Sequence, residues 1–170
     1  MIQKKICMIG AFAVGKTSLV KRFVKGIFSE SYLTTVGVKI DKREVEVEGQ
    51  VVNLLLWDIH GEDEFQKLRL SHLRGMSGYL LVIDQTRGIT LANAVALQKS
   101  TEDSFGKLPF LLVCNKHDLK SEADITESQL DALREQGWKI VFTSAKTGEG
   151  VEEMFHELTR EMLAEMSTNE

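Results

Sequence analysis

A glycine-rich loop between an apolar run and an amphipathic segment constrains the fold of this chain most. Residues 6–9 form a short apolar run that predicts a buried strand. Residues 10–17 follow with the pattern G-x-x-x-x-G-K-T, and residues 16–25 carry apolar side chains at helical spacing. Such a loop, placed before a helix N-terminus, points several backbone N–H groups at one spot, where they can hold phosphate oxygens. The sequence therefore predicts a strand–loop–helix unit that binds phosphate.

The rest of the chain alternates between strand-like and helix-like segments. A turn at residues 48–50 joins two segments that predict an antiparallel hairpin, 38–48 and 51–57. Further strands are predicted at 78–84, 109–115 and 138–143, and further helices at 91–100, at 128–136 and from 151 onward. Six strands and about five helices predict an α/β fold, in which helices cover both faces of a mostly parallel six-stranded sheet with one antiparallel strand. In such a sheet the ligand binds at the carboxyl ends of the strands.

Composition excludes several classes of protein. The length of 170 residues suits one domain, and the net charge of −4 disfavours nucleic acid or an anionic membrane surface as the main partner. The apolar runs are too short to cross a bilayer, so we expect no integral membrane segment. Cys7 and Cys114 lie in apolar runs and predict buried, reduced thiols in a cytoplasmic protein.

The first two strand ends carry residues suited to phosphate and Mg²⁺. Lys16 of the loop can reach the β- and γ-phosphates, and the hydroxyl of Thr17 can bind Mg²⁺. Asp58 follows the strand predicted at 51–57, where its carboxylate can hold a Mg²⁺-bound water. Gly61 allows its backbone N–H to approach a γ-phosphate. Together these residues predict a nucleoside triphosphate site.

Two later strand ends carry residues suited to a guanine base. The sequence Asn115-Lys116-His117-Asp118 follows the strand predicted at 109–115. The Asp118 carboxylate can accept hydrogen bonds from guanine N1–H and from the 2-amino group, and adenine offers neither. The sequence Ser144-Ala145-Lys146 follows the last predicted strand, where a backbone N–H can donate to guanine O6. The order of these elements favours guanine over adenine nucleotides.

These four elements, in this order and spacing, resemble those of the Ras-like small GTPases over essentially the whole chain. Residues 28–38 and Arg74-Gly75 are most similar to Rab-like members. The resemblance implies a P-loop NTPase G domain at 1–166, with a phosphate loop at 10–17, switch I at about 26–37 and switch II at about 59–75. Residues 167–170 are then a short tail.

The resemblance implies a molecular switch that binds GTP and GDP with Mg²⁺ and hydrolyses GTP to GDP and phosphate. Phe28 is expected against the guanine, Lys116 over the base, and Ser144 in support of the base-reading loop. The expected Mg²⁺ ligands are Thr17, Thr35 and, through water, Asp58. The expected catalytic residues are Lys16, Thr35, Gly61 and Glu62. The remaining nucleotide contacts are expected from Ala13, Val14, Gly15, Ser18, Asn115, Asp118, Ala145 and Lys146.

Three residues near the phosphates depart from the family pattern. Glu62 stands where the family has a glutamine that positions water; an ionised carboxylate only accepts hydrogen bonds, so slow or altered hydrolysis is expected. Phe12 stands where a small residue is usual, and its ring either crowds the γ-phosphate or packs on a neighbouring segment. His60 either takes part in catalysis or simply faces solvent or switch II.

Partner-binding positions also depart from the Rab pattern. Ile40, Trp57 and His72 stand where Rab proteins carry an aromatic triad, so the usual Rab effectors are not expected. The sequence ends without a cysteine for prenylation. We expect a monomer that meets effectors and regulators through switches I and II, without nucleic acid.

Two other functions remain to be weighed against the switch. A nucleotide-loaded scaffold with little turnover would also carry Glu62 and Phe12. An ATP-using P-loop kinase is disfavoured by residues 115–118, which favour guanine, and by the absence of a separate lid or acceptor domain. Measured turnover separates the switch from the scaffold, and competition between ATP and GTP for bound GDP tests the choice of base.

Overall fold

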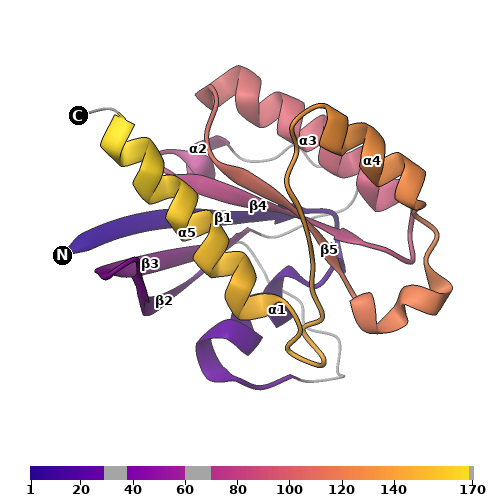
Figure 1. Cartoon of the computed structure of the whole chain (residues 1–170), viewed down its shortest axis with the longest axis horizontal. Coiled ribbons are helices and arrows are strands. Elements are labelled where there is room, and N and C mark those ends of the chain that lie inside the picture. The colour runs from indigo at the N-terminus through magenta and orange to yellow at the C-terminus, as the bar shows by residue number, and fades with distance from the viewer. Residues whose placement is uncertain (29–37, 60–69, 169–170) are drawn as a thin grey trace.

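A computed structural model describes residues 1–28, 38–59 and 70–168, with the side chain of Leu70 excepted. Its centre is a six-stranded sheet with the strand order β2-β3-β1-β4-β5-β6 (Figure 1). The strands are β1 (Ile2–Gly10), β2 (Val38–Val47), β3 (Gln50–Ile59), β4 (Gly78–Asp84), β5 (Phe110–Asn115) and β6 (Ile140–Phe142).

Strand direction follows from the connections between the strands. Among the described strands, β2 and β3 form the only antiparallel pair, since a turn of two residues joins them. The pairs β1–β3, β1–β4, β4–β5 and β5–β6 are parallel. The carboxyl ends of β1, β3, β4, β5 and β6 therefore meet at one edge of the sheet. This confirms the predicted mostly parallel sheet with one antiparallel strand.

Helices cover both faces of the sheet. They are α1 (Lys16–Lys25), α2 (Leu70–Leu73), α3 (Ile89–Phe105), α4 (Glu127–Glu135) and α5 (Val151–Thr168), with a 3₁₀ segment at His117–Glu122. Helices α1 and α5 pack on one face, where the rings of Phe23 and Phe155 stack at 3.9 Å. Helices α2, α3 and α4 pack on the other face (Figure 1). The sheet thus separates two apolar clusters.

Some elements differ in length from the prediction. Strand β1 starts at Ile2 rather than at residue 6, because residues 2–5 pair with residues 52–55 of β3 despite their polar side chains. Helix α3 spans Ile89–Phe105 rather than 91–100, and the hydroxyl of Thr101, buried within the added part, donates to the Leu97 carbonyl at 2.7 Å. Strand β5 starts at Phe110, one residue after Pro109. Helix α5 extends to Thr168.

Both cysteines are free and buried, as the sequence predicts. Burial raises the pKa of the Cys7 thiol to about 12, against a smaller opposing effect of Lys5, and burial also raises the pKa of Cys114 to about 12. These thiols are therefore poor nucleophiles near neutral pH. None of the helices in the described part of the chain is long and apolar enough to cross a membrane.

Candidate nucleotide site

The phosphate loop runs from the end of β1 into the first turn of α1. Lys16 is only 6% exposed, and its ammonium donates to the carbonyls of Gly10 at 2.7 Å and Ala11 at 3.1 Å. Burial lowers the pKa of Lys16 to about 8, and the nearby Asp58 carboxylate opposes that shift. The lysine is therefore held against the inner side of its own loop.

Two glycines are required here by close approach of other groups. A Cβ on Gly15 would lie 2.3 Å from Asn115 Nδ2, and the φ angle of Gly15, +103°, is one that other residues rarely adopt. A Cβ on Gly10 would lie 2.4 Å from the carbonyl oxygen of Val82 in β4. The loop thus fits against β4 and β5 only without side chains at these positions.

Thr17 and Asp58 meet as the sequence predicts. The Thr17 hydroxyl donates to Asp58 Oδ2 at 2.5 Å, and Asp58 is 1% exposed. A hydroxyl and a carboxylate oxygen at one point are hard ligands, the kind that Mg²⁺ takes together with nucleotide phosphates. The donor set therefore fits Mg²⁺. In the described ranges, no cluster of three or more His, Cys, Asp or Glu side chains offers a metal site made by the protein alone.

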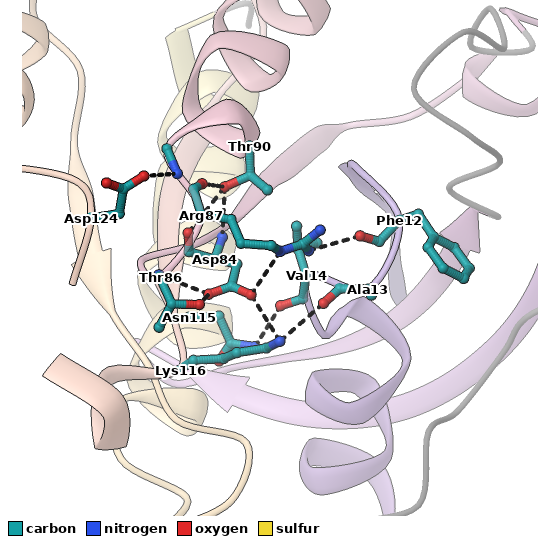
Figure 2. Close-up of polar contacts among 11 residues, drawn as sticks. Phe12, Ala13, Val14, Asp84, Thr86, Arg87, Thr90, Asn115, Lys116 and Asp124 are labelled. Carbon is teal, nitrogen blue, oxygen red and sulfur yellow. Dashed lines mark hydrogen bonds and ion pairs between the residues drawn. The ribbon is translucent and has the colours of Figure 1, made fainter. Parts of the chain in front are cut away.

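Asn115 links the base-reading strand to the phosphate loop. Its side-chain amide donates to the carbonyl of Val14 at 2.9 Å (Figure 2). Its side-chain oxygen accepts from the hydroxyl of Thr143 at 3.0 Å. Asn115 is 1% exposed and Thr143 is fully buried. One buried amide thus connects the loop after β1, the end of β5 and the end of β6.

Lys116 makes a second link to the same loop. Its ammonium donates to the carbonyl of Ala13 at 3.1 Å and lies 2.9 Å from Asp84 Oδ2 (Figure 2). The backbone of Lys116 has a φ of +63°, uncommon for a residue with a side chain, and the two contacts help to fix it. The lysine stem is therefore anchored between β4, β5 and the phosphate loop.

The base-reading loop is held by hydrogen bonds of Ser144, which follows β6, with Asp118, which follows β5, and with Thr147. The Ser144 hydroxyl donates to Asp118 Oδ1 at 2.8 Å and accepts from the backbone N–H of Thr147 at 3.1 Å. Ser144 and Ala145 are buried, while the side chains of Asp118 and Lys146 are exposed. The Asp118 carboxylate is thus fixed by a hydrogen bond to one of its oxygens and lies exposed at the carboxyl edge of the sheet.

The structure brings together most of the residues predicted for the site. Phe28 is partly buried against the apolar cluster beneath α1 and α5. Ser18 is the third residue of α1. Thr35, His60, Gly61 and Glu62 lie outside the described residues.

The sequence reasoning missed Asp84, Arg87 and Thr143. Asp84 ends a strand whose every residue is buried, and an acid at such a strand end was a signal that could have been used. Arg87 and Thr143 carry no comparable local signal for the site, since Arg87 reaches Phe12 and Thr143 reaches Asn115 across large separations in the sequence.

Comparison with known proteins decides the family. A model of the Ras family matches residues 5–164. The chain belongs to the Ras family. It is 35% identical to Ras-related protein Rab-13 of Mesocricetus auratus over 94% of this chain and 79% of that protein. It is 34% identical to Ras-related protein Rab-4 of Dictyostelium discoideum over 98% of this chain and 82% of that protein. This Ras-family chain is thus a divergent Rab-like small GTPase.

Identity to Ras-related protein SEC4 of Saccharomyces cerevisiae is 34%, over 97% of this GTPase and 77% of that protein. A G domain that shares a third of its residues with several Rab proteins keeps the fold and leaves room for changes at individual positions. Phe12, one of those noted from the sequence, is 42% exposed.

Proposed function

We propose that this GTPase is a molecular switch that binds GTP and GDP with Mg²⁺ and hydrolyses GTP slowly. The observation that carries the proposal is the set of contacts joining the phosphate loop to the base-reading loop. Asn115 holds the Val14 carbonyl and Lys116 holds the Ala13 carbonyl. Because these hydrogen bonds connect the loop for the phosphates with the residues for the base, the site suits a nucleotide that dissociates slowly.

In this proposal the phosphates lie in the loop at residues 10–17. The backbone N–H groups of Ala13, Val14, Gly15, Lys16, Thr17 and Ser18 donate to phosphate oxygens. The Lys16 ammonium, already lodged within the loop, supplies a positive charge beside the β- and γ-phosphates. The dipole of α1 adds a favourable field at its N-terminus.

At the base, Asp118 accepts from the two guanine N–H groups, and a backbone N–H near Ala145 donates to O6. The bond from Ser144 to Asp118 Oδ1 supports this assignment, because it orients the carboxylate and still leaves an acceptor site on each oxygen for the two guanine N–H groups. The Lys116 stem packs over the ring, and Phe28 and Lys146 flank it.

Mg²⁺, when bound, would neutralise charge on the β- and γ-phosphates. Thr17 would hold it directly and Asp58 through water, and the hydrogen bond between them supports this pairing. Thr35 is proposed as the ligand that senses the γ-phosphate, and Gly61 as a backbone donor to it. Contacts that exist only with GTP would order switch I and switch II, and hydrolysis would release them.

Glu62 is proposed to slow the reaction, because a carboxylate near the γ-phosphate accepts from water but donates nothing. The second candidate function, a nucleotide-loaded scaffold, is favoured by Glu62 and by the bulky Phe12 within the phosphate loop.

Partners would meet the switches and the surface around Ile40, Trp57 and His72. Ile40 is 48% exposed and lies opposite Trp57 in the β2–β3 pair. The chain is proposed to act as a monomer in the cytoplasm.

The deciding experiment starts with the nucleotide that the purified protein carries, identified by chromatography. GDP or GTP is expected, displaced by guanine nucleotides and not by ATP. Displacement by ATP at equal concentration would refute the choice of base. Single-turnover hydrolysis is then compared between wild type and Glu62→Gln, where faster hydrolysis by the variant is expected. Equal rates would show that Glu62 does not limit the reaction, and no turnover in either protein would favour the scaffold.

A further inference from the structure

Arg87 makes a contact with the phosphate loop that the known pattern of site residues does not include. It lies between β4 and α3, three residues after Asp84. Its guanidinium donates from one terminal nitrogen to the Phe12 carbonyl at 2.9 Å and from Nε to Asp84 Oδ2 at 3.1 Å (Figure 2). Arg87 and Phe12 are 75 positions apart in the chain, so the contact exists only in the folded protein.

Asp84 holds the Arg87 guanidinium in its position against the phosphate loop. Its side chain is 2% exposed, and Oδ2 receives both Arg87 and Lys116. Oδ1 accepts from the backbone N–H of Thr86 at 2.9 Å and from its hydroxyl at 2.7 Å. Burial alone would raise the pKa of the Asp84 carboxyl, but hydrogen bonds from Lys116 and Thr86 outweigh it and keep the pKa below the usual value. The carboxylate is therefore charged at neutral pH and holds both cations.

The backbone of Arg87 is fixed as well. Its carbonyl accepts from the hydroxyl of Thr90 at 2.7 Å and from the backbone N–H of Thr90 at 3.1 Å. The next residue, Gly88, donates its backbone N–H to Asp124 Oδ2 at 2.6 Å. The arginine side chain thus extends from a rigid position toward the loop, although the side chain itself is 38% exposed.

Three consecutive loop carbonyls are consequently held from the side of β4 and β5. Arg87 holds that of Phe12, Lys116 that of Ala13, and Asn115 that of Val14. In a trans peptide unit the C=O of one residue and the N–H of the next point in opposite directions. Holding the Phe12 carbonyl toward Arg87 therefore directs the N–H of Ala13 away from it. Ala13 needs such support, since its φ of +63° is uncommon for a residue with a Cβ.

We propose that Arg87 is a positioning residue for the phosphate loop: it fixes the peptide between Phe12 and Ala13 so that the Ala13 N–H faces the nucleotide phosphates, and it thereby slows GDP release. This inference rests on the proposed binding of guanine nucleotide. In Figure 2 the Phe12 ring points away from the network, so the contact depends on the Phe12 backbone and not on its side chain.

The test measures release of a fluorescent GDP analogue, in Mg²⁺ and excess unlabelled GDP, from wild type, Arg87→Ala and Arg87→Lys. Because the Arg87 side chain is 38% exposed, loss of its bond to the Phe12 carbonyl is taken as that of an ordinary hydrogen bond and predicts release about five- to tenfold faster from Arg87→Ala. Arg87→Lys keeps a positive charge without the two-pronged guanidinium and is expected to fall between. Arg134→Ala is the matched control, because Arg134 pairs with Glu127 and Asp131 on α4 and makes its ion pairs there. The Arg134→Ala variant is expected to release GDP at the wild-type rate.

A second readout separates positioning from a general loss of structure. The affinity for guanosine, which has no phosphate, is measured by competition with the same analogue. Arg87→Ala is expected to weaken GDP and leave guanosine within twofold of wild type. Equal weakening of both ligands would indicate a structural role and overturn the inference. If Arg87→Ala does not fold, Arg87→Lys carries the same two measurements.

The behaviour of wild type distinguishes a failure of nucleotide binding from a failure of the Arg87 contact. Wild type that binds no guanine nucleotide would overturn both the proposed function and the role of Arg87. Wild type that binds GDP, with Arg87→Ala releasing it at the wild-type rate, would overturn the role of Arg87 alone.

Discussion

Replacing Gly15 with alanine is expected to destabilise the domain far more than the same replacement at Gly26. Both glycines flank α1, and both have a positive φ, +103° at Gly15 and +70° at Gly26. A Cβ at Gly26 meets nothing within 4 Å, whereas a Cβ at Gly15 would lie 2.3 Å from Asn115 Nδ2. The pair therefore separates backbone strain from collision with the buried amide.

The size of the effect follows from what the collision displaces. Backbone strain contributes about 1 kcal/mol at either position. At Gly15 the Asn115 amide must also move, which removes its bonds to Val14 and Thr143 and leaves buried polar groups unpaired. Two such bonds at about 1 kcal/mol each, plus the unpaired groups, bring the expected loss for Gly15→Ala to about 3–4 kcal/mol. Domains of this size have roughly 5–15 kcal/mol in total, so the loss is large.

The assay is urea unfolding of nucleotide-stripped wild type, Gly15→Ala and Gly26→Ala, followed by circular dichroism. The free energy of unfolding is expected to drop by about 3–4 kcal/mol for Gly15→Ala and by about 1 kcal/mol for Gly26→Ala. Equal losses in the two variants would refute the argument that Asn115 is held by the absence of a side chain at Gly15. The unfolding free energy should fall with urea concentration at the same slope in all three proteins, which checks that each unfolds in the same kind of transition.

Three further predictions concern the base, the metal and the core. Asp118→Ala is expected to reduce the preference for GDP over ADP by at least about tenfold, because the carboxylate acceptor is lost; an unchanged preference in competition assays would contradict this. Asp58→Ala is expected to release GDP rapidly with or without a chelator, whereas wild type is expected to release GDP faster only when the chelator removes Mg²⁺. If GDP release from Asp58→Ala still became faster on adding the chelator, the metal would lie elsewhere. Phe155→Ala removes a fully buried ring stacked on Phe23 and is expected to cost about 3–5 kcal/mol of unfolding free energy; a loss below about 1 kcal/mol in urea unfolding would show that the site collapses around the gap.

The sequence predicted the sheet well because buried parallel strands carry continuous apolar runs. The strands predicted at 78–84 and 109–115 are β4 (Gly78–Asp84) and β5 (Phe110–Asn115), the second one residue shorter than predicted. The N-terminal half of β1 was not predicted, because Lys4 and Lys5 break the apolar pattern. Lys5 is accommodated by its position 3.5 Å from the centre of the Trp57 ring and by its bond to the Arg74 carbonyl at 2.8 Å. Contacts of that kind cannot be read from local sequence.

The site was predictable where chemistry follows from a short motif. Lys16, Thr17 and Asp58 lie together as their strand ends required. The structural role of Asn115 was not predicted, because the amide acts on a loop about a hundred positions earlier in the chain. Arg87 was missed for the same reason, since nothing near residue 87 indicates a partner at Phe12. Short motifs predict the residues that bind the ligand. The residues that hold them in position come from distant parts of the chain and are known only from the folded structure.

The separation of the two apolar clusters by the sheet bears on how such a protein changes over evolutionary time. Phe12, Arg87 and Asp118, for which roles are proposed above, lie at the carboxyl edge and belong to neither cluster. Substitutions at exposed positions of that edge, unlike those at Gly15 or the buried Asn115, leave both clusters intact. Changes at a few exposed edge positions can therefore alter how the site treats nucleotide or partners while the two apolar clusters, and with them the fold, stay the same.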